Sequence, residues 1–160
     1  MLIIAHRGNL EGPSPQENKP EYIQKALDYG FIVEVDVWGI DCNSNNMIWL
    51  GHDGPHYPKQ FEWLLKPGLF IHCKDIAALW HCKELGVKHY FSHDKDKAVM
   101  TSSGYFWTYP DNNIELTKFS IPVIFSKKDS LWGVQSLSQV AGICTDYPVH
   151  YDALFNQGAI

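Results

Sequence analysis

The feature that most constrains this chain is a regular alternation of short apolar runs with polar turns. Each run is four to eight residues long and rich in Val, Ile, Phe and Tyr, a pattern that favours strands over helices. The runs are 2–5, 31–38, 47–50, 69–73, 88–92, 104–108, 121–125 and 140–144. None reaches the roughly 20 apolar residues that a membrane-spanning helix requires, so we expect no membrane span.

Two amphipathic stretches between these runs predict helices. Asn18 is suited to cap a helix that begins at about Lys19 and ends at Gly30. Asp75 is suited to cap a second helix, which Gly86 closes.

Strands that alternate with helices indicate an α/β fold, in a single domain over residues 1–160. Eight strands are the number that closes a (β/α)8 barrel, but such barrels typically use about 250 residues. The length therefore predicts a compact TIM-like barrel in which several helices are shortened or missing. An open, doubly wound sheet is the alternative architecture.

Charge and cysteine content limit the partners and the compartment. The formal net charge of −5 argues against nucleic acid or an anionic membrane surface as the main partner. No cleavable signal precedes the first apolar run, so we expect a cytoplasmic protein. Cys42, Cys73, Cys82 and Cys144 lack CxxC spacing, and we expect free thiols at all four positions.

Two carboxylates share one face of the second predicted strand. Side chains alternate along a strand, so Glu34 and Asp36 lie together, opposite the valines that flank them. Two neighbouring carboxylates repel each other unless a cation or hydrogen-bond donors compensate. The pair indicates either an oxygen-ligand site for a divalent ion or an exposed polar strand face with no ligand.

Ionisable residues also follow three other apolar runs. His6 and Arg7 follow the first run, His52 follows the third, and His72 and Lys74 close the fourth. In α/β barrels the carboxyl ends of the strands form the active-site face, so we expect these groups to converge. The remaining histidines are expected to have surface or core roles; they are His56, His81, His89, His93 and His150.

Taken in order, these blocks resemble the glycerophosphodiester phosphodiesterase family. The matching stretches are AHRGN (5–9), PQEN (15–18), VEVDV (33–37), GHD (51–53), IHCKD (71–75) and ICTDYP (143–148). They span nearly the whole chain in the family's order. The resemblance implies a metal-dependent phosphodiester hydrolase that acts on glycerophosphodiesters or related lipid or sugar phosphodiesters, in which a neighbouring substrate hydroxyl attacks phosphorus and the resulting cyclic phosphate is hydrolysed.

The resemblance also implies roles for individual residues. His6 and His52 correspond to the catalytic acid–base pair, and imidazole suits this task because its reference pKa of about 6.5 lies near neutral pH. Glu34 and Asp36 correspond to ligands of a divalent ion, which is Mg²⁺ or Ca²⁺ in the family.

Substrate contacts are implied for a second group of residues. Arg7 and Lys74 correspond to contacts with the phosphate, for which a guanidinium fork and an ammonium group are suited. The resemblance also groups Glu17 with the substrate-binding residues and implies that it supports the first loop or the metal site. Asp146 contributes to the rim of the site or, equally, forms a turn before Pro148.

The chain departs from the family at His72, where a glutamate is usually the third metal ligand. Imidazole is neutral and softer than carboxylate, so a Glu34, Asp36 and His72 site favours Mn²⁺ or another softer ion. The alternative is a non-catalytic relative that binds a phosphorylated sugar or a lipid head group.

Residues 54–68 are a second departure, because the family commonly has a larger insertion there, and the short segment predicts an open site. The oligomeric state is left open, although a barrel flank without helices would favour a dimer. Several tryptophans could form a stacking wall for a sugar, with core packing the expected role for most of them: Trp38, Trp49, Trp63, Trp107 and Trp132.

Overall fold

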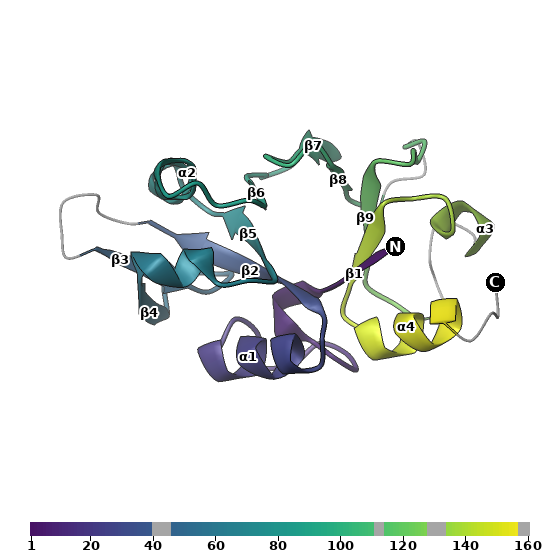
Figure 1. Ribbon diagram of the computed structural model, residues 1–160, viewed down its shortest axis with the longest axis horizontal. Coiled ribbons are helices and arrows are strands. Elements are labelled where there is room, and N and C mark those ends of the chain that lie inside the picture. The colour runs from purple at the N-terminus through teal and green to yellow at the C-terminus, as the bar shows by residue number, and fades with distance from the viewer. Residues whose placement is uncertain (40–45, 111–113, 128–133, 157–160) are drawn as a thin grey trace.

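The computed structural model is a mixed α/β fold (Figure 1), and it describes residues 1–39, 46–110, 114–127 and 134–156. Cys42, Trp132 and most of the polar segment 39–46, which joins the second and third predicted runs, lie outside these residues. The strands are β1 Leu2–Ala5, β2 Ile32–Trp38, β3 Met47–Leu50, β4 Tyr57–Gln60, β5 Leu69–Cys73, β6 Tyr90–Phe91, β7 Ala98–Met100, β8 Phe106–Thr108, β9 Ser120–Ile124 and β10 Gly142–Thr145. The helices are α1 Pro20–Asp28, α2 Ile76–Glu84, α3 Val134–Leu137 and α4 Pro148–Asn156, with 3₁₀ turns η1 His6–Gly8 and η2 Phe61–Leu65.

Seven of the strands run parallel in one continuous order. The ladders connect β6 to β5, β5 to β2, β2 to β1, β1 to β10, β10 to β9 and β9 to β8. The carboxyl ends of parallel strands lie at the same edge of a sheet, so residues that follow these strands are brought together.

The third predicted strand differs from expectation in its direction. β3 pairs antiparallel with β2, through Val37 with Leu50 and Trp38 with Trp49, and β4 extends this hairpin. β3 therefore returns along the protruding end of β2, and the residues after it reach the carboxyl edge from the opposite direction. A second antiparallel strand, β7, lies against β8 at the other end of the sheet.

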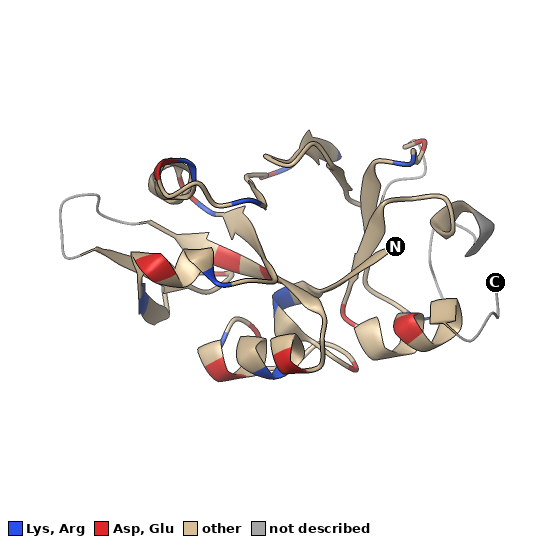
Figure 2. Ribbon diagram, in the orientation of Figure 1, with Lys and Arg blue, Asp and Glu red and all other residues tan. Residues whose placement is uncertain are grey.

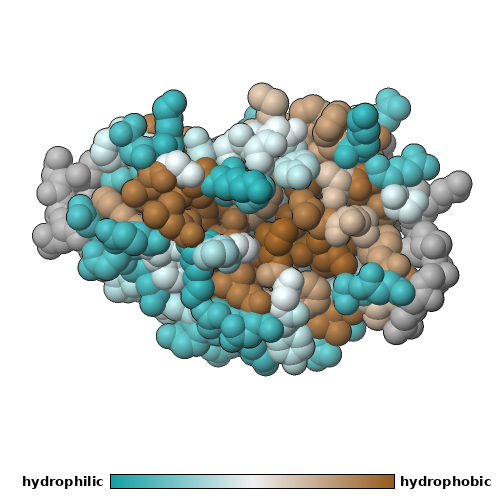
Figure 3. Space-filling model, viewed as in Figure 1, coloured by the Kyte–Doolittle hydropathy of each residue, from teal (hydrophilic) through white to brown (hydrophobic). Residues whose placement is uncertain are grey.

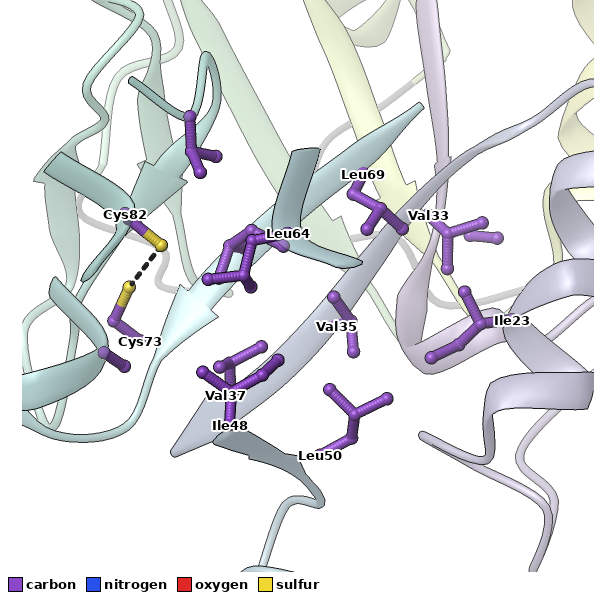
Figure 4. Packing of buried hydrophobic residues seen from close by; sticks show 14 of the residues in the cluster. Ile23, Val33, Val35, Val37, Ile48, Leu50, Leu64, Leu69, Cys73 and Cys82 are labelled. Carbon is purple, nitrogen blue, oxygen red and sulfur yellow. Dashed lines mark hydrogen bonds between the residues drawn. The ribbon is translucent and has the colours of Figure 1, made fainter. Parts of the chain in front are cut away.

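One side of β2 forms the centre of the largest apolar cluster. Val33, Val35 and Val37 are fully buried and pack with Ile23 of α1 and Leu64 of η2 (Figure 4). Burial of a valine side chain contributes about 1.5–3 kcal/mol, so this face fixes β2 in the structure. The opposite side of β2 is thereby committed to Glu34 and Asp36, as the alternation of the sequence predicts.

The helix starts show one confirmed prediction and one wrong one. Asp75 caps α2, since its carboxylate accepts a hydrogen bond from the Ala78 backbone N–H at 2.7 Å. Asn18 does not cap α1; Lys19 is the N-cap residue and makes no side-chain cap hydrogen bond. Asn18 has a φ of 61°, in the left-handed region, and its side chain bonds Asp36 instead.

Two strands meet through side chains where no ladder is present. Within the described residues, no backbone pairing connects β6 to β8. Instead, Phe91 of β6 stacks on Trp107 of β8 with ring centroids 4.4 Å apart, and His93 stacks on Tyr109 at 3.7 Å. Figure 3 shows that hydrophobic side chains occupy the middle of one face of the molecule, inside a border of hydrophilic ones. None of the described helices is long and apolar enough to cross a bilayer.

Candidate functional site

The carboxyl ends of the parallel strands surround a pocket of about 310 Å³. Its lining combines residues from every one of these ends except that of β10, and it includes His52 from the turn after β3. The lining residues are His6, Arg7, Glu34, His52, His72, Lys74, His93, Asp94, Trp107, Tyr109, Val123 and Phe125. The predicted convergence of the ionisable residues is confirmed, and both implied acid–base histidines face one cavity.

A tight turn places His6 and Arg7 at this cavity. β1 ends at Ala5 and passes directly into η1, in which Arg7 has a φ of 52° and Gly8 a φ of 83°. A Cβ on Gly8 would lie 3.3 Å from the backbone of Ile23, so α1 closes over the turn at a position where a side chain is strained. The HRG sequence therefore turns the chain sharply at the strand end.

Hydrogen bonds orient the buried ring of His6. Its Nδ1 donates to Asp146 Oδ1 at 2.8 Å, which leaves Nε2 toward Glu34 Oε2, 3.9 Å away. Burial lowers the pKa of His6, but the hydrogen bond to Asp146 and the charge of Glu34 outweigh it and raise the pKa above its usual value. Asp146 therefore holds the tautomer and orientation of His6, which is more than the turn or rim role expected of it.

A polar network behind His6 fixes the first loop. Asn9 donates from its amide to Asp146 Oδ1 at 2.7 Å and to Glu17 Oε1 at 2.8 Å. Glu17 in turn accepts from the Arg7 guanidinium at 3.1 Å. Glu17 thus supports the loop, as predicted; it is absent from the pocket lining. Sequence reasoning gave no role to Asn9, although it belongs to the AHRGN stretch.

Glu34, Asp36 and His72 form a buried cluster at the wall of the pocket, to whose lining Glu34 and His72 belong. Each offers a ligand atom, and these atoms all lie within 4.8 Å of one another. His72 Nδ1 is 2.9 Å from Asp36 Oδ1 and 3.6 Å from Glu34 Oε1. The acidic residues within β2 are visible in the middle of the molecule in Figure 2. The three residues come from adjacent strands, since Asp36 and His72 are direct partners in the β2–β5 ladder.

The unpaired atoms of this cluster suit a divalent cation. His72 Nε2 donates to the backbone carbonyl of His93 at 3.3 Å, which leaves Nδ1 to face the two carboxylates. Asp36 Oδ1 is buried, and the nearest groups that can balance its charge are His72 Nδ1 at 2.9 Å and Lys74 Nζ at 3.6 Å. Buried carboxylate oxygens without donors are costly, and a cation satisfies them. The donor set of two carboxylates and one imidazole therefore fits a divalent ion, as the sequence predicted.

Protonation of His72 offers the same compensation without a cation. Burial lowers the pKa of His72, but the carboxylates of Asp36 and Glu34 outweigh it and raise the pKa to about 9. Burial alone would raise the pKa of the Asp36 carboxyl. His72 and Arg7 outweigh burial and hold that pKa below its usual range. In the metal-free protein at neutral pH, His72 is therefore an imidazolium held by two carboxylates.

Asp36 is held in place by the side chain of Asn18, which we expected to cap a helix. The Asn18 amide donates to Asp36 Oδ2 at 2.9 Å, and the Asn18 carbonyl oxygen accepts from the Asp36 backbone N–H at 2.9 Å. The Arg7 guanidinium lies 3.2 Å from the same Oδ2, and Lys74 Nζ lies 3.6 Å from Oδ1. Arg7 and Lys74, which also line the pocket, thus each lie close to a carboxylate oxygen of Asp36.

His52 reaches the pocket on a turn that β2 anchors. The Trp38 indole N–H donates to the Gly51 carbonyl oxygen at 2.6 Å, and the Gly51 N–H donates to the Asp36 carbonyl oxygen at 3.1 Å. His52 Nδ1 lies 2.5 Å from Asp53 Oδ1, in a partly exposed pair. The GHD stretch therefore places a second imidazole in the pocket that His6 lines, although β3 runs antiparallel.

His93 also lines the pocket, although we expected it to have a surface or core role. It lies two residues beyond β6 and directly follows the predicted run 88–92, as His6 directly follows the run 2–5. Position at a strand end, the signal that selected His6 and His72, could therefore have found His93 as well. Trp107, expected mainly in the core, is buried there and also lines the pocket.

Searches of protein-family models, of curated proteins and of solved structures give no match to this chain. The resemblance to the phosphodiesterase family therefore depends on the motifs and on the place of their residues in the structure.

Proposed function

We propose that this protein is a metal-dependent phosphodiester hydrolase that acts on glycerophosphodiester-like or related lipid or sugar phosphodiesters. The observation that supports this most directly is the composition of one pocket. His6 and His52 face it together with Arg7 and Lys74, beside a buried group of potential metal ligands. Basic side chains suit an anionic substrate, and two imidazoles suit proton transfer at neutral pH.

A closed (β/α)8-like barrel is part of this proposal. The parallel order from β6 through β1 to β8 contains seven strands, and its two ends are in contact through Phe91 and Trp107. Side-chain contact at that point supports a ring of strands around the pocket. A cytoplasmic location also remains part of the proposal; Cys73, Cys82 and Cys144 are free thiols, as reducing conditions would keep them.

Glu34, Asp36 and His72 would hold the divalent ion. When bound, the ion would neutralise charge on the phosphoryl oxygens and orient the attacking hydroxyl. Arg7 reinforces this neutralisation through the guanidinium that already faces Asp36, and Lys74 does so through its ammonium group. Both cations are held by carboxylates before substrate binds, so little reorganisation is needed.

The two histidines would share the proton transfers. One imidazole accepts the proton of a water molecule or substrate hydroxyl whose oxygen attacks phosphorus. The other donates a proton to the alkoxide that leaves as the P–O bond breaks, so that charge and protons balance. Asp146 orients His6 for this task through its 2.8 Å hydrogen bond to Nδ1.

A second candidate function is a non-catalytic module that binds a phosphorylated sugar or lipid head group. The observation that favours it is the position of His72 Nδ1, 2.9 Å from Asp36 Oδ1 and 3.6 Å from Glu34 Oε1, where the two carboxylates outweigh burial and raise the pKa of His72 to about 9. An imidazolium at this position takes the place of a metal ion and leaves a cationic pocket that binds phosphate without turnover.

Hydrolysis of bis(p-nitrophenyl) phosphate and of glycerophosphodiesters, measured with Mg²⁺, Ca²⁺ and Mn²⁺ and with a chelator, distinguishes the two. We expect metal-dependent activity that falls by about 10²–10⁴-fold in His6→Ala and in His52→Ala. His150→Ala is the matched control, since His150 lies on α4 outside the pocket lining and should retain full activity. Activity that survives both site substitutions contradicts the hydrolase. Metal-independent phosphate binding without product supports the binding module.

A further inference from the structure

A second cavity lies at the edge of the sheet where the parallel strands begin, opposite the pocket described above. It is lined by residues 32, 64–69 and 86–89, and we call it the amino-edge cavity. Ile32 and Leu69 are the first residues of β2 and β5, and residues 86–89 lead into β6. The volume is about 510 Å³, larger than the 310 Å³ of the other pocket. None of the residues assigned to the proposed hydrolase lines this cavity.

The floor of the amino-edge cavity is aliphatic. Leu64, Leu69 and Val87 are at most 9% exposed, whereas Leu65 is 50% exposed. The one aromatic ring of the lining is the imidazole of His89, which is already stacked on two neighbouring rings. A planar ligand would need a free aromatic face to stack on, whereas a flexible hydrocarbon chain packs well against leucine and valine side chains. The floor therefore favours an aliphatic group over an aromatic one.

The charged side chains of this lining are all basic. Lys66 and Lys88 line the cavity and no acidic residue does, although the whole chain has a formal net charge of −5. Within the described part of the chain, neither lysine lies within 4.0 Å of a carboxylate. Lys66 donates to the side-chain oxygen of Gln24, which uses one of its three N–H groups. Positive charge without a carboxylate partner, beside an apolar floor, attracts an anion.

His89 adds a neutral donor beside one of these lysines. Its Nδ1 is hydrogen-bonded to the Ser103 hydroxyl at 2.9 Å, so Nε2 is the ring nitrogen available to a ligand. Burial, and then the charge of Lys88, lower the pKa of His89 below its usual value. The ring is therefore neutral at pH 7, and with Nδ1 accepting from Ser103 its proton is on Nε2. A carboxylate can accept from this N–H and from the Lys88 ammonium group.

We propose that the amino-edge cavity binds a single-chain aliphatic carboxylate, with the tail on the aliphatic floor and the carboxylate at Lys88 and His89 Nε2. The cavity lies within the range of small-molecule sites, about 300–1,000 Å³, and holds one medium-length chain rather than a diacyl lipid. Lysine binds an anion as a point charge, and the only arginine of the chain, whose fork matches phosphate, is Arg7 in the other pocket. The inference is independent of the proposed function.

Titration calorimetry with ten-carbon probes separates the contributions of head and tail. The probes are decanoate, decanol and decyltrimethylammonium, each below the concentration at which it aggregates. We expect decanoate to bind about tenfold more tightly than decanol, because only the carboxylate forms charge-assisted hydrogen bonds, and we expect no binding of the cation. Nonanoate and octanoate should bind successively more weakly, by about 2–4-fold for each methylene removed.

Two substitutions assign this binding to the cavity. Lys88→Gln should weaken decanoate binding by about 5–10-fold and leave decanol binding unchanged. Leu65→Ser should weaken both by about 2–4-fold, and the fold should tolerate it because Leu65 is half exposed. Lys83→Gln is the matched control, since Lys83 is exposed on α2 outside the lining and its loss should leave decanoate affinity unchanged.

Equal affinity for decanoate and decanol, no binding of decanoate, or unchanged affinity in Lys88→Gln overturns the assignment. Competition between decanoate and methyl phosphate would place decanoate in the other pocket and overturn it as well. A dimer that forms with rising protein concentration, that Leu65→Ser abolishes and that decanoate does not dissociate would show that a second copy of the chain occupies the cavity instead. Decanoate binding by a protein that cleaves no diester supports the cavity and refutes only the hydrolase.

Discussion

Asn18 should be among the residues whose loss is most costly to the stability of this protein. It is 1% exposed and makes two hydrogen bonds to Asp36, each of 2.9 Å. Asn18→Ala removes a hydrogen bond to a carboxylate, worth about 1.5–3 kcal/mol, and leaves the buried Asp36 N–H unsatisfied at a cost of about 1–3 kcal/mol. Alanine at a φ of 61° adds about 1–2 kcal/mol. Because water can enter the vacated space, we expect a net loss of about 3–5 kcal/mol.

Two further variants separate the hydrogen bonds from the backbone conformation. Asn46 has a φ of 52° and an exposed side chain, so Asn46→Ala should cost only the conformational penalty of about 1–2 kcal/mol. Asn18→Gly removes the same hydrogen bonds but tolerates the positive φ, so it should be less destabilising than Asn18→Ala.

Urea unfolding in the presence of a chelator measures these differences as changes in the free energy of unfolding. Calcium titration of the same variants should show weaker binding for both Asn18 substitutions, because the Asp36 carboxylate is no longer held. The reasoning fails if Asn18→Ala costs no more than Asn46→Ala, or if both Asn18 variants bind Ca²⁺ as tightly as the native protein.

Three other predictions follow from the cation site, the turn after β3 and a buried histidine. A divalent cation at 100 times its Kd should stabilise the fold by about 2.7 kcal/mol and raise Tm by roughly 5–11 °C; a shift that persists in Asp36→Asn contradicts the site. Gly51→Ala should lower kcat/KM by about 10²-fold, because a Cβ there would lie 2.2 Å from the Gly54 carbonyl oxygen; unchanged hydrolysis argues against the role of this turn. Burial lowers the pKa of His81, opposed by Asp75, so the folded state resists protonation and stability should fall as pH drops below about 6.5. In urea melts across that pH range, His81→Phe should show a flatter decline, and equal slopes refute this.

The sequence predicts best those strands whose own residues strongly favour the strand conformation. β1, β2, β3 and β5 begin and end within one residue of the predicted runs, because consecutive β-branched and aromatic residues fill both sides of a buried strand. β4 and β7 were missed. Their sequences, YPKQ and AVM, are short and largely exposed, and they are strands because β3 and β8 provide hydrogen-bond partners.

The direction of a strand is a second property that the pattern does not contain. Alternation of side chains is the same in parallel and antiparallel strands, so the run 47–50 gave no sign that it pairs antiparallel with β2. His52 nevertheless arrives at the pocket, since the hairpin returns it beside Asp36. The motif therefore located the residue correctly although the strand direction assumed for it was wrong.

In the candidate site, too, some residues were predictable from the sequence and others were not. Glu34, Asp36 and His72 were predictable because a period of two and a shared strand edge place them together. The partners that orient them were not, because Asn18 and Asp146 meet Asp36 and His6 through contacts between distant parts of the chain. The spacing of residues in the sequence indicates which face of a strand a side chain occupies. Only the folded structure shows which hydrogen-bond donor lies beside it.

The presence of an imidazole beside two carboxylates determines how this cluster is stabilised without a metal ion. Three buried carboxylates would need a cation for the chain to fold without strong repulsion, whereas two carboxylates and an imidazole can balance their charge with one proton. The proton on His72 and a metal ion then compete for the same nitrogen and the same Asp36 oxygen. Metal binding must displace that proton, so the protein gives up affinity in exchange for a metal-free state in which β2 and β5 stay paired. A chelated sample should therefore remain folded, and its cation affinity should rise with pH.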